Sequence, residues 1–159
     1  MLSKQYLKDY IYCIGEIDDV EEKIARLERD IAKVEERIRE IEANDTVKDK
    51  VYGGDGGEQG FVIEGIPTVE YGEKKNLLTI KSALLHTRKS ELEILRIDLV
   101  QRTKDVEMFI ASVNDAYIRR IINLRYIKRM TWKDVAIHVG GGNSEDTVRK
   151  ALDAFLKNS

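Results

Sequence analysis

The architecture of this 159-residue chain follows first from residues 6–41, which read YLKDYIYCIGEIDDVEEKIARLERDIAKVEERIREI. Apolar and aromatic side chains recur there at alternating intervals of four and three residues, a 3.5-residue repeat kept over five heptads. This repeat is typical of a coiled-coil helix, which we expect over about residues 3–43. Such a helix does not bury its apolar seam alone, so the repeat predicts a partner helix.

Eight side chains of this seam are candidates for contacts between helices, including contacts between chains that would build an oligomer. They are Ile17, Val20, Ile24, Leu27, Ile31, Val34, Ile38 and Ile41. Charges beside an apolar seam set the partner and its orientation. On one flank this sequence places a glutamate row, consisting of Glu21, Glu28, Glu35 and Glu42.

A second heptad pattern, over about residues 75–113, supplies a candidate partner for an antiparallel hairpin. Its apolar residues recur every seven positions, at Leu78, Leu85, Leu92, Leu99, Val106 and Val113. Among them Lys81, Arg88 and Arg102 are spaced to reach the glutamate row. Further apolar residues lie off this seam, so we expect hairpins to associate, as in a four-helix dimer. These residues are Leu77, Ile80, Leu84, Ile94 and Ile97.

Residues 44–74, between the two helices, are rich in glycine and contain the run Gly53-Gly54-Asp55-Gly56-Gly57. Phe61–Glu64 and Thr68–Tyr71 read as two short strands around the turn Gly65-Ile66-Pro67. We therefore expect a small β-ribbon at the tip of the hairpin. No Gly-Lys-Ser/Thr follows the glycines, so the segment does not match a phosphate-binding loop.

The composition excludes several classes of protein. A single cysteine, Cys13, and two distant histidines, His86 and His138, rule out a disulfide framework and any familiar zinc pattern. No apolar run is long enough for a membrane span. The single cysteine fits a reducing compartment, so we expect a cytoplasmic protein. No carboxylate pairs with Ser, Cys or His at catalytic spacing, so we expect that it is not an enzyme and has no cofactor.

Charge is divided unevenly along the chain. Residues 115–159 carry nine Lys/Arg and five Asp/Glu, a net charge of +4, whereas residues 1–114 carry 18 and 24, a net charge of −6. A basic segment on an acidic body indicates a footprint for a polyanion. The same difference is also compatible with ordinary variation of surface charge.

Residues 115–159 read as three helices separated by short breaks. A helix over residues 115–129 has one apolar face, and Thr131 caps a short helix over Trp132–Val139. A glycine turn at residues 140–143 follows, and Ser144 caps a last helix whose apolar face centres on Val148 and Leu152. This order predicts a helix-turn-helix, which places its last helix in the major groove, although a generic three-helix cap gives the same pattern.

The candidate DNA-binding residues divide by position. Arg149 and Lys150 are placed to approach base edges or phosphates, and backbone amides near Ser144 to hold a phosphate at the helix N-terminus. Basic residues around the first break are expected to clamp the DNA backbone. The full set is Arg125, Lys128, Arg129, Lys133, Asn143, Ser144, Thr147, Arg149 and Lys150. A helical projection of the last helix places Asp146, Lys150, Asp153 and Lys157 opposite its apolar face. On the preceding short helix, we expect the ring of Trp132 to be buried.

Three blocks of this segment resemble a known domain. Ile121–Ile127, Thr131–Ala136 and Thr147–Lys150 are similar in order and spacing to region 4 of sigma factors, which reads part of the bacterial promoter. The chain as a whole resembles small phage and prophage regulators of late-gene transcription, of the ArpU and RinA type. The resemblance implies a role in phage gene expression, inside a bacterial host cell.

Three interpretations follow from these patterns. The first is a sequence-specific transcription regulator that binds double-stranded DNA, oligomerises through its coiled coil and contacts bacterial RNA polymerase. The second is a small subunit of a phage DNA-packaging terminase, whose DNA-binding module usually precedes its hairpin rather than following it. The third is a coiled-coil interaction protein that binds polymerase without DNA.

Overall fold

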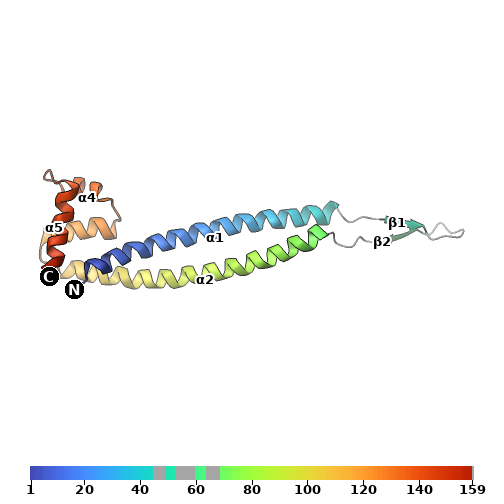
Figure 1. Ribbon diagram of the computed structural model, residues 1–159, viewed down its shortest axis with the longest axis horizontal. Helices are drawn as coiled ribbons and strands as arrows, with labels where there is room; N and C mark the ends of the chain where they lie inside the picture. Colours follow the sequence, from blue (N-terminus) through green and yellow to red (C-terminus); the bar gives the residue numbers. More distant parts are fainter. Residues whose placement is uncertain (45–48, 53–59, 64–68, 159) are drawn as a thin grey trace. The chain divides into compact units, whose positions relative to one another are not determined.

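The computed structural model describes residues 1–44, 49–52, 60–63 and 69–158, and these ranges are mainly helical, as predicted (Figure 1). Contacts divide the chain into two compact units, unit 1 with residues 1–19 and 92–159 and unit 2 with residues 20–91. No helix within the described ranges combines the length and the apolar character that crossing a membrane requires. The elements are α1 (Lys4–Asn44), β1 (Asp49–Tyr52), β2 (Gly60–Ile63), α2 (Val69–Ser112), α3 (Ala116–Ile122), the π-helical turn η1 (Asn123–Ile127), α4 (Trp132–Val139) and α5 (Glu145–Lys157).

In unit 2, α1 and α2 run antiparallel. Two earlier residues of α1 pair with later residues of α2, and two later residues of α1 pair with earlier residues of α2, as an antiparallel pair requires. The pairs are Glu28–Lys89, Asp30–Lys81, Arg37–Glu70 and Glu42–Lys75. Lys81 therefore reaches Asp30 rather than the glutamate row. Lys75 and Lys89, which the heptad analysis did not select, contact that row instead.

The two arginines predicted to cross the hairpin pair within their own helix. Arg88 lies 2.9 Å from Glu91 and Arg102 lies 2.7 Å from Asp98. A partner three or four residues away on the same helix is within reach without ordering a second helix, so neither arginine pairs with the glutamate row as predicted. Arg102 contacts α1 in another way, with its guanidinium 5.4 Å from the centre of the Tyr6 ring.

The seam assigned to contacts between chains is covered within one chain. Six of its eight side chains are buried and the other two, Leu27 and Ile31, are partly buried. The buried six are Ile17, Val20, Ile24, Val34, Ile38 and Ile41. The hairpin thus satisfies the seam, and the assignment of these residues to oligomer contacts is corrected.

Two short strands pair between the helices. β1 and β2 are antiparallel, with Asp49 opposite Ile63 and Tyr52 opposite Gly60. The first predicted strand overlaps β2 over residues 61–63, but its partner is β1, which the sequence pattern did not indicate. The glycine run 53–57 and the turn 65–67 lie outside the described residues.

The second predicted strand is wrong, because its residues from Val69 onward form the first turn of α2. Two contacts to α1 hold this turn in place. Arg37 donates two hydrogen bonds to Glu70, and the hydroxyl of Tyr71 donates to Glu42 at 2.9 Å. A negative side chain in the first turn of a helix is also favourable electrostatically. The four-residue pattern that suggested a strand does not indicate either contact, because both partners lie on α1.

Unit 1 has one apolar core built from both ends of the sequence. Leu7 and Tyr10 of α1 and Val106 of α2 belong to the same cluster as Val135 of α4 and Leu152 of α5. The predicted boundary, with a hairpin over 1–114 and a separate domain over 115–159, is therefore wrong. The first turns of α1 and the end of α2 belong to the C-terminal unit.

Three polar contacts join α1 to α2 beside this core. The Tyr6 hydroxyl donates to Asp105 at 2.6 Å, Tyr10 pairs with Thr103 at 3.3 Å, and the Cys13 sulfur lies 3.7 Å from Asp98. Burial, together with the hydrogen bond to Asp105, raises the pKa of Tyr6 to about 12. The Tyr6 hydroxyl therefore keeps its proton at physiological pH and remains the donor to Asp105.

Replacing Leu7 by alanine tests the shared core. Because Leu7 is fully buried, we expect Leu7→Ala to lower the free energy of unfolding by about 2–5 kcal/mol, measured by urea denaturation of the full chain. The control Ile137→Ala truncates an exposed side chain in the same unit and should change stability by less than about 0.5 kcal/mol. Equal effects for the two variants would contradict a core that includes α1.

Candidate nucleic-acid interface

The first helix of the C-terminal segment begins and ends through local polar contacts. The Asp115 side chain accepts from the backbone N–H groups of Tyr117 and Ile118, which caps α3. Past Ile122 the helix widens into η1, where the N–H of Lys128 donates to the carbonyl of Asn123, five residues back. Part of the predicted helix over 115–129 is therefore a π-helical turn, which ends before Arg129 in the left-handed region at a φ of 59°.

Helix α4 has the bounds and the cap that the sequence predicted. The Thr131 hydroxyl accepts from the N–H of Asp134 at 3.2 Å and lies 2.7 Å from the Asp134 carboxylate. Val135 and Ala136 are buried in the core of unit 1. Thr131 thus satisfies one of the free donors at the helix start, as an N-cap does.

The connection from α4 to α5 depends on three consecutive glycines. Gly140, Gly141 and Gly142 have φ values of 78°, 71° and 70°, a left-handed region that other L-residues adopt only at a cost. The Asn143 side chain donates to the carbonyl of Gly140 at 2.7 Å. Asn143, predicted as a DNA-binding residue, therefore helps to close the turn.

Helix α5 begins at the predicted cap. The Ser144 hydroxyl accepts from the N–H of Thr147 at 3.2 Å, and the two hydroxyls lie 2.8 Å apart. Val148 and Leu152 are buried, so this face packs into the core of unit 1. Thr147 and Lys150 are exposed, and no ion pair or hydrogen bond joins the Lys150 side chain to another described residue.

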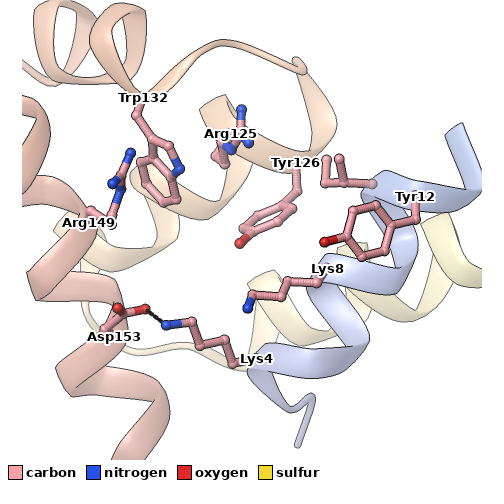
Figure 2. A pocket seen from close by; sticks show the side chains of 9 residues that line it. Lys4, Lys8, Tyr12, Arg125, Tyr126, Trp132, Arg149 and Asp153 are labelled. Carbon is pink, nitrogen blue, oxygen red and sulfur yellow. Dashed lines mark ion pairs between the residues drawn. The ribbon is translucent and has the colours of Figure 1, made fainter. Parts of the chain in front are cut away.

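Arg149 and Lys150, predicted to act together, lie on different sides of α5. The Arg149 guanidinium donates to Glu145 at 2.6 Å and lies 5.7 Å from the centre of the Trp132 ring. This contact turns Arg149 toward α4, as Figure 2 shows. Lys150 is left as the basic side chain on the outward face near the start of α5.

Trp132 is half-buried at the surface rather than enclosed in the core. Its ring lies between two guanidinium groups, with Arg125 at 5.1 Å and Arg149 at 5.7 Å from the ring centre (Figure 2). Both distances are within the range of cation–π attraction. The prediction of a buried plug is wrong, because the ring packs against the core of unit 1 but stays partly exposed beside the two arginines.

The four basic residues predicted as backbone clamps do not form one group. Arg125 is half-buried and donates to the carbonyl of Met130 at 2.7 Å, so it closes the break between η1 and α4. Lys128, Arg129 and Lys133 are exposed, and no described residue forms an ion pair with them. These three remain available for a polyanion.

Asp153 departs from the predicted solvent-facing row. It forms an ion pair with Lys4 of α1 at 2.8 Å, within unit 1 (Figure 2). The sequence analysis did not predict that Lys4 and its neighbours on α1 contact the C-terminal helices. The spacing of residues 115–159 does not indicate which distant segment packs against them. The apolar residues that α1 contributes to the core of unit 1 could have indicated this contact.

The comparisons with known proteins add no family to this geometry. No family model matches the sequence, and neither the curated proteins nor the solved structures include a match.

The glycine turn can be tested by adding a methyl group where there is space for one. We expect Gly142→Ala to lower the free energy of unfolding by about 1–2 kcal/mol, because alanine is strained at this φ. The control Gly15→Ala, inside α1, should raise it by about 0.5–1 kcal/mol.

Nothing lies within 4 Å of an added Cβ at either glycine, so the comparison isolates the backbone conformation. Urea denaturation of both variants measures the two effects. A Gly142→Ala variant at least as stable as the unmodified chain would argue against the left-handed turn.

Proposed function

We propose that the protein binds double-stranded DNA through α5 and regulates transcription in a phage or prophage setting. The observation that carries the proposal is the disposition of α5. Its buried face packs into unit 1, while Thr147 and Lys150 near its start face outward. The link to transcription rests on the resemblance of residues 121–150 to region 4 of sigma factors, and the phage setting rests on the resemblance of the whole chain to small phage and prophage regulators.

The order α3, α4, glycine turn and α5 suits a helix-turn-helix. In that motif the second helix enters the major groove with its N-terminal residues at the base edges, and the preceding helix crosses the backbone. The major groove is about 12 Å wide and admits one α-helix. In this proposal Lys150 approaches base edges or phosphates, and α4 lies across the backbone.

The charge near α4 and α5 supports a role for phosphate contacts. Lys128 and Arg129 precede α4, and Lys133 lies in its first turn. Contacts of this kind position a protein on the duplex without reading its sequence. Backbone N–H groups at the start of α5, beside Ser144, add partial positive charge for one further phosphate.

The experiment that tests the proposal is selection of a duplex from a random-sequence pool, followed by fluorescence anisotropy at several salt concentrations. We expect log affinity to fall linearly with log salt, with a slope of about −0.9 per neutralised phosphate. Lys150→Glu should weaken binding to the selected duplex at least about tenfold and reduce the slope.

Lys33→Glu makes the same charge change at an exposed position of α1 and serves as the control. It should leave both affinity and slope close to those of the unmodified chain. Equal loss in the two variants, or no selected duplex, would refute α5 as the DNA-reading helix.

We also propose that two copies associate through the outer face of α2. Within unit 1, Ile94 and Ile97 are 68% and 66% exposed, and Met108 lies two heptads after Ile94. Within unit 2, Ile80 is 66% exposed and occupies the same heptad position. Exposed apolar side chains on the outer face of a helix favour burial against a second copy, as in a four-helix dimer.

The dimer can be tested by light scattering after size exclusion. We expect the mass of two chains, and we expect Ile94→Asp to give the mass of one chain with unchanged helicity. Ile137→Asp places the same charge at an exposed apolar position of α4 and should leave the dimer intact. One chain per particle for the unmodified protein would remove the proposal.

A further inference from the structure

A cavity of about 310 Å³ opens in unit 1 between the first turns of α1 and the C-terminal helices (Figure 2). Its lining combines four basic side chains and three aromatic rings with one aliphatic and one acidic residue. Ligand sites begin at about this volume and place a few polar groups among apolar and aromatic ones. None of the α1 residues that line it belongs to the DNA interface proposed above.

The charge of the lining favours an anion. Lys4 is neutralised by Asp153 at 2.8 Å, and Arg149 is paired with Glu145 at 2.6 Å. Lys8 and Arg125 line the same cavity, and among the described residues no carboxylate forms an ion pair with either. Two uncompensated cations facing one cavity are the arrangement that a phosphate or carboxylate ligand requires.

A neutral hydrogen-bond donor lies beside these cations. Tyr126 of η1 is buried, yet its hydroxyl is directed into the cavity in Figure 2. Burial raises the pKa of Tyr126, although Arg125 opposes the shift, so the phenol keeps its proton at neutral pH. Among the described residues no hydrogen bond satisfies this hydroxyl, which leaves it free to donate to an anion.

The aromatic part of the lining favours a ligand that also carries a flat ring. Tyr12 of α1 is 65% exposed and lies at the cavity with its hydroxyl toward that of Tyr126 (Figure 2). The faces of Trp132 are already occupied by arginines, so the accessible ring is that of Tyr12. A nucleobase can stack on such a ring, because every base has a flat π-face.

We propose that this cavity binds a nucleoside phosphate, with the phosphate between Lys8, Arg125 and the Tyr126 hydroxyl and the base against Tyr12. Inorganic phosphate satisfies the cations but not the ring, and a nucleoside satisfies the ring but not the cations. The same chemistry is available from a free nucleotide or from the phosphorylated end of a single strand.

Trp132 is the single tryptophan of the chain and lines the cavity, so its fluorescence reports binding directly. The probes are AMP, GMP, adenosine, inorganic phosphate and a 5′-phosphorylated ten-nucleotide oligothymidine. We expect a saturable change with AMP or GMP, and at least about tenfold weaker binding of adenosine and of phosphate. Saturation by the oligonucleotide alone would identify a strand end as the source of the same ligand chemistry.

Two exposed side chains of α1 provide variants that should fold normally, which circular dichroism checks. Lys8→Glu should weaken nucleotide binding at least about tenfold by replacing a cation with an anion. Tyr12→Ala should weaken it about fivefold or more by removing the stacking ring. Lys33→Glu, on α1 away from the cavity, should have no effect.

Absence of a saturable signal up to about 5 mM nucleotide and oligonucleotide would overturn the proposal. Binding that Lys8→Glu leaves unchanged would overturn it as well. Equal affinity for AMP and inorganic phosphate would overturn the role of the ring. Because Lys8 and Lys150 lie on different helices, failure here and failure of the DNA proposal are recognised separately.

Discussion

The apolar core of unit 1 is the constraint on which the C-terminal helices depend. Helices α3, α4 and α5 have 7, 8 and 13 residues, and isolated helices of this length are marginal in water. Their stability must come from packing, and Leu7 and Tyr10 of α1 belong to the cluster that they share. The first turns of α1 and the end of α2 are therefore part of the folding unit that presents α5.

This packing also decides which surface each residue of α5 reaches. Consecutive residues on an α-helix point about 100° apart, so burial of Val148 and Leu152 leaves Arg149 and Lys150 in different directions. Arg149 is held by Glu145 and Trp132, whereas Lys150 faces outward. Similarity to a known motif shows that residue types and their spacing match. It does not show whether a side chain points toward a ligand or away from it, because the neighbouring residues in the fold decide that.

The sequence predicted those features that depend on residues close together in the chain. The caps at Thr131 and Ser144, the glycine turn and the bounds of α4 follow from local hydrogen bonds and backbone preference. The heptads predicted an antiparallel hairpin because the repeat is long. The start of α2 and the exposure of Trp132 were mispredicted, and the partner of Asp153 was missed. The start of α2 and the partner of Asp153 depend on residues from a distant segment, which no local pattern contains. The exposure of Trp132 depends on how neighbouring elements pack, which places Arg125 and Arg149 over its ring.

The two proposed sites are neighbours on α5. Arg149 lines the cavity, where its guanidinium contacts Glu145 and Trp132, and it is adjacent in sequence to Lys150. An anion in the cavity would compete with Glu145 for Arg149, because both offer oxygen acceptors to the same guanidinium. Any effect of a nucleotide on DNA affinity must then be matched by an equal effect of DNA on nucleotide affinity, since the coupling free energy between two sites is reciprocal. Two sites with no neighbouring residue in common would bind their ligands independently.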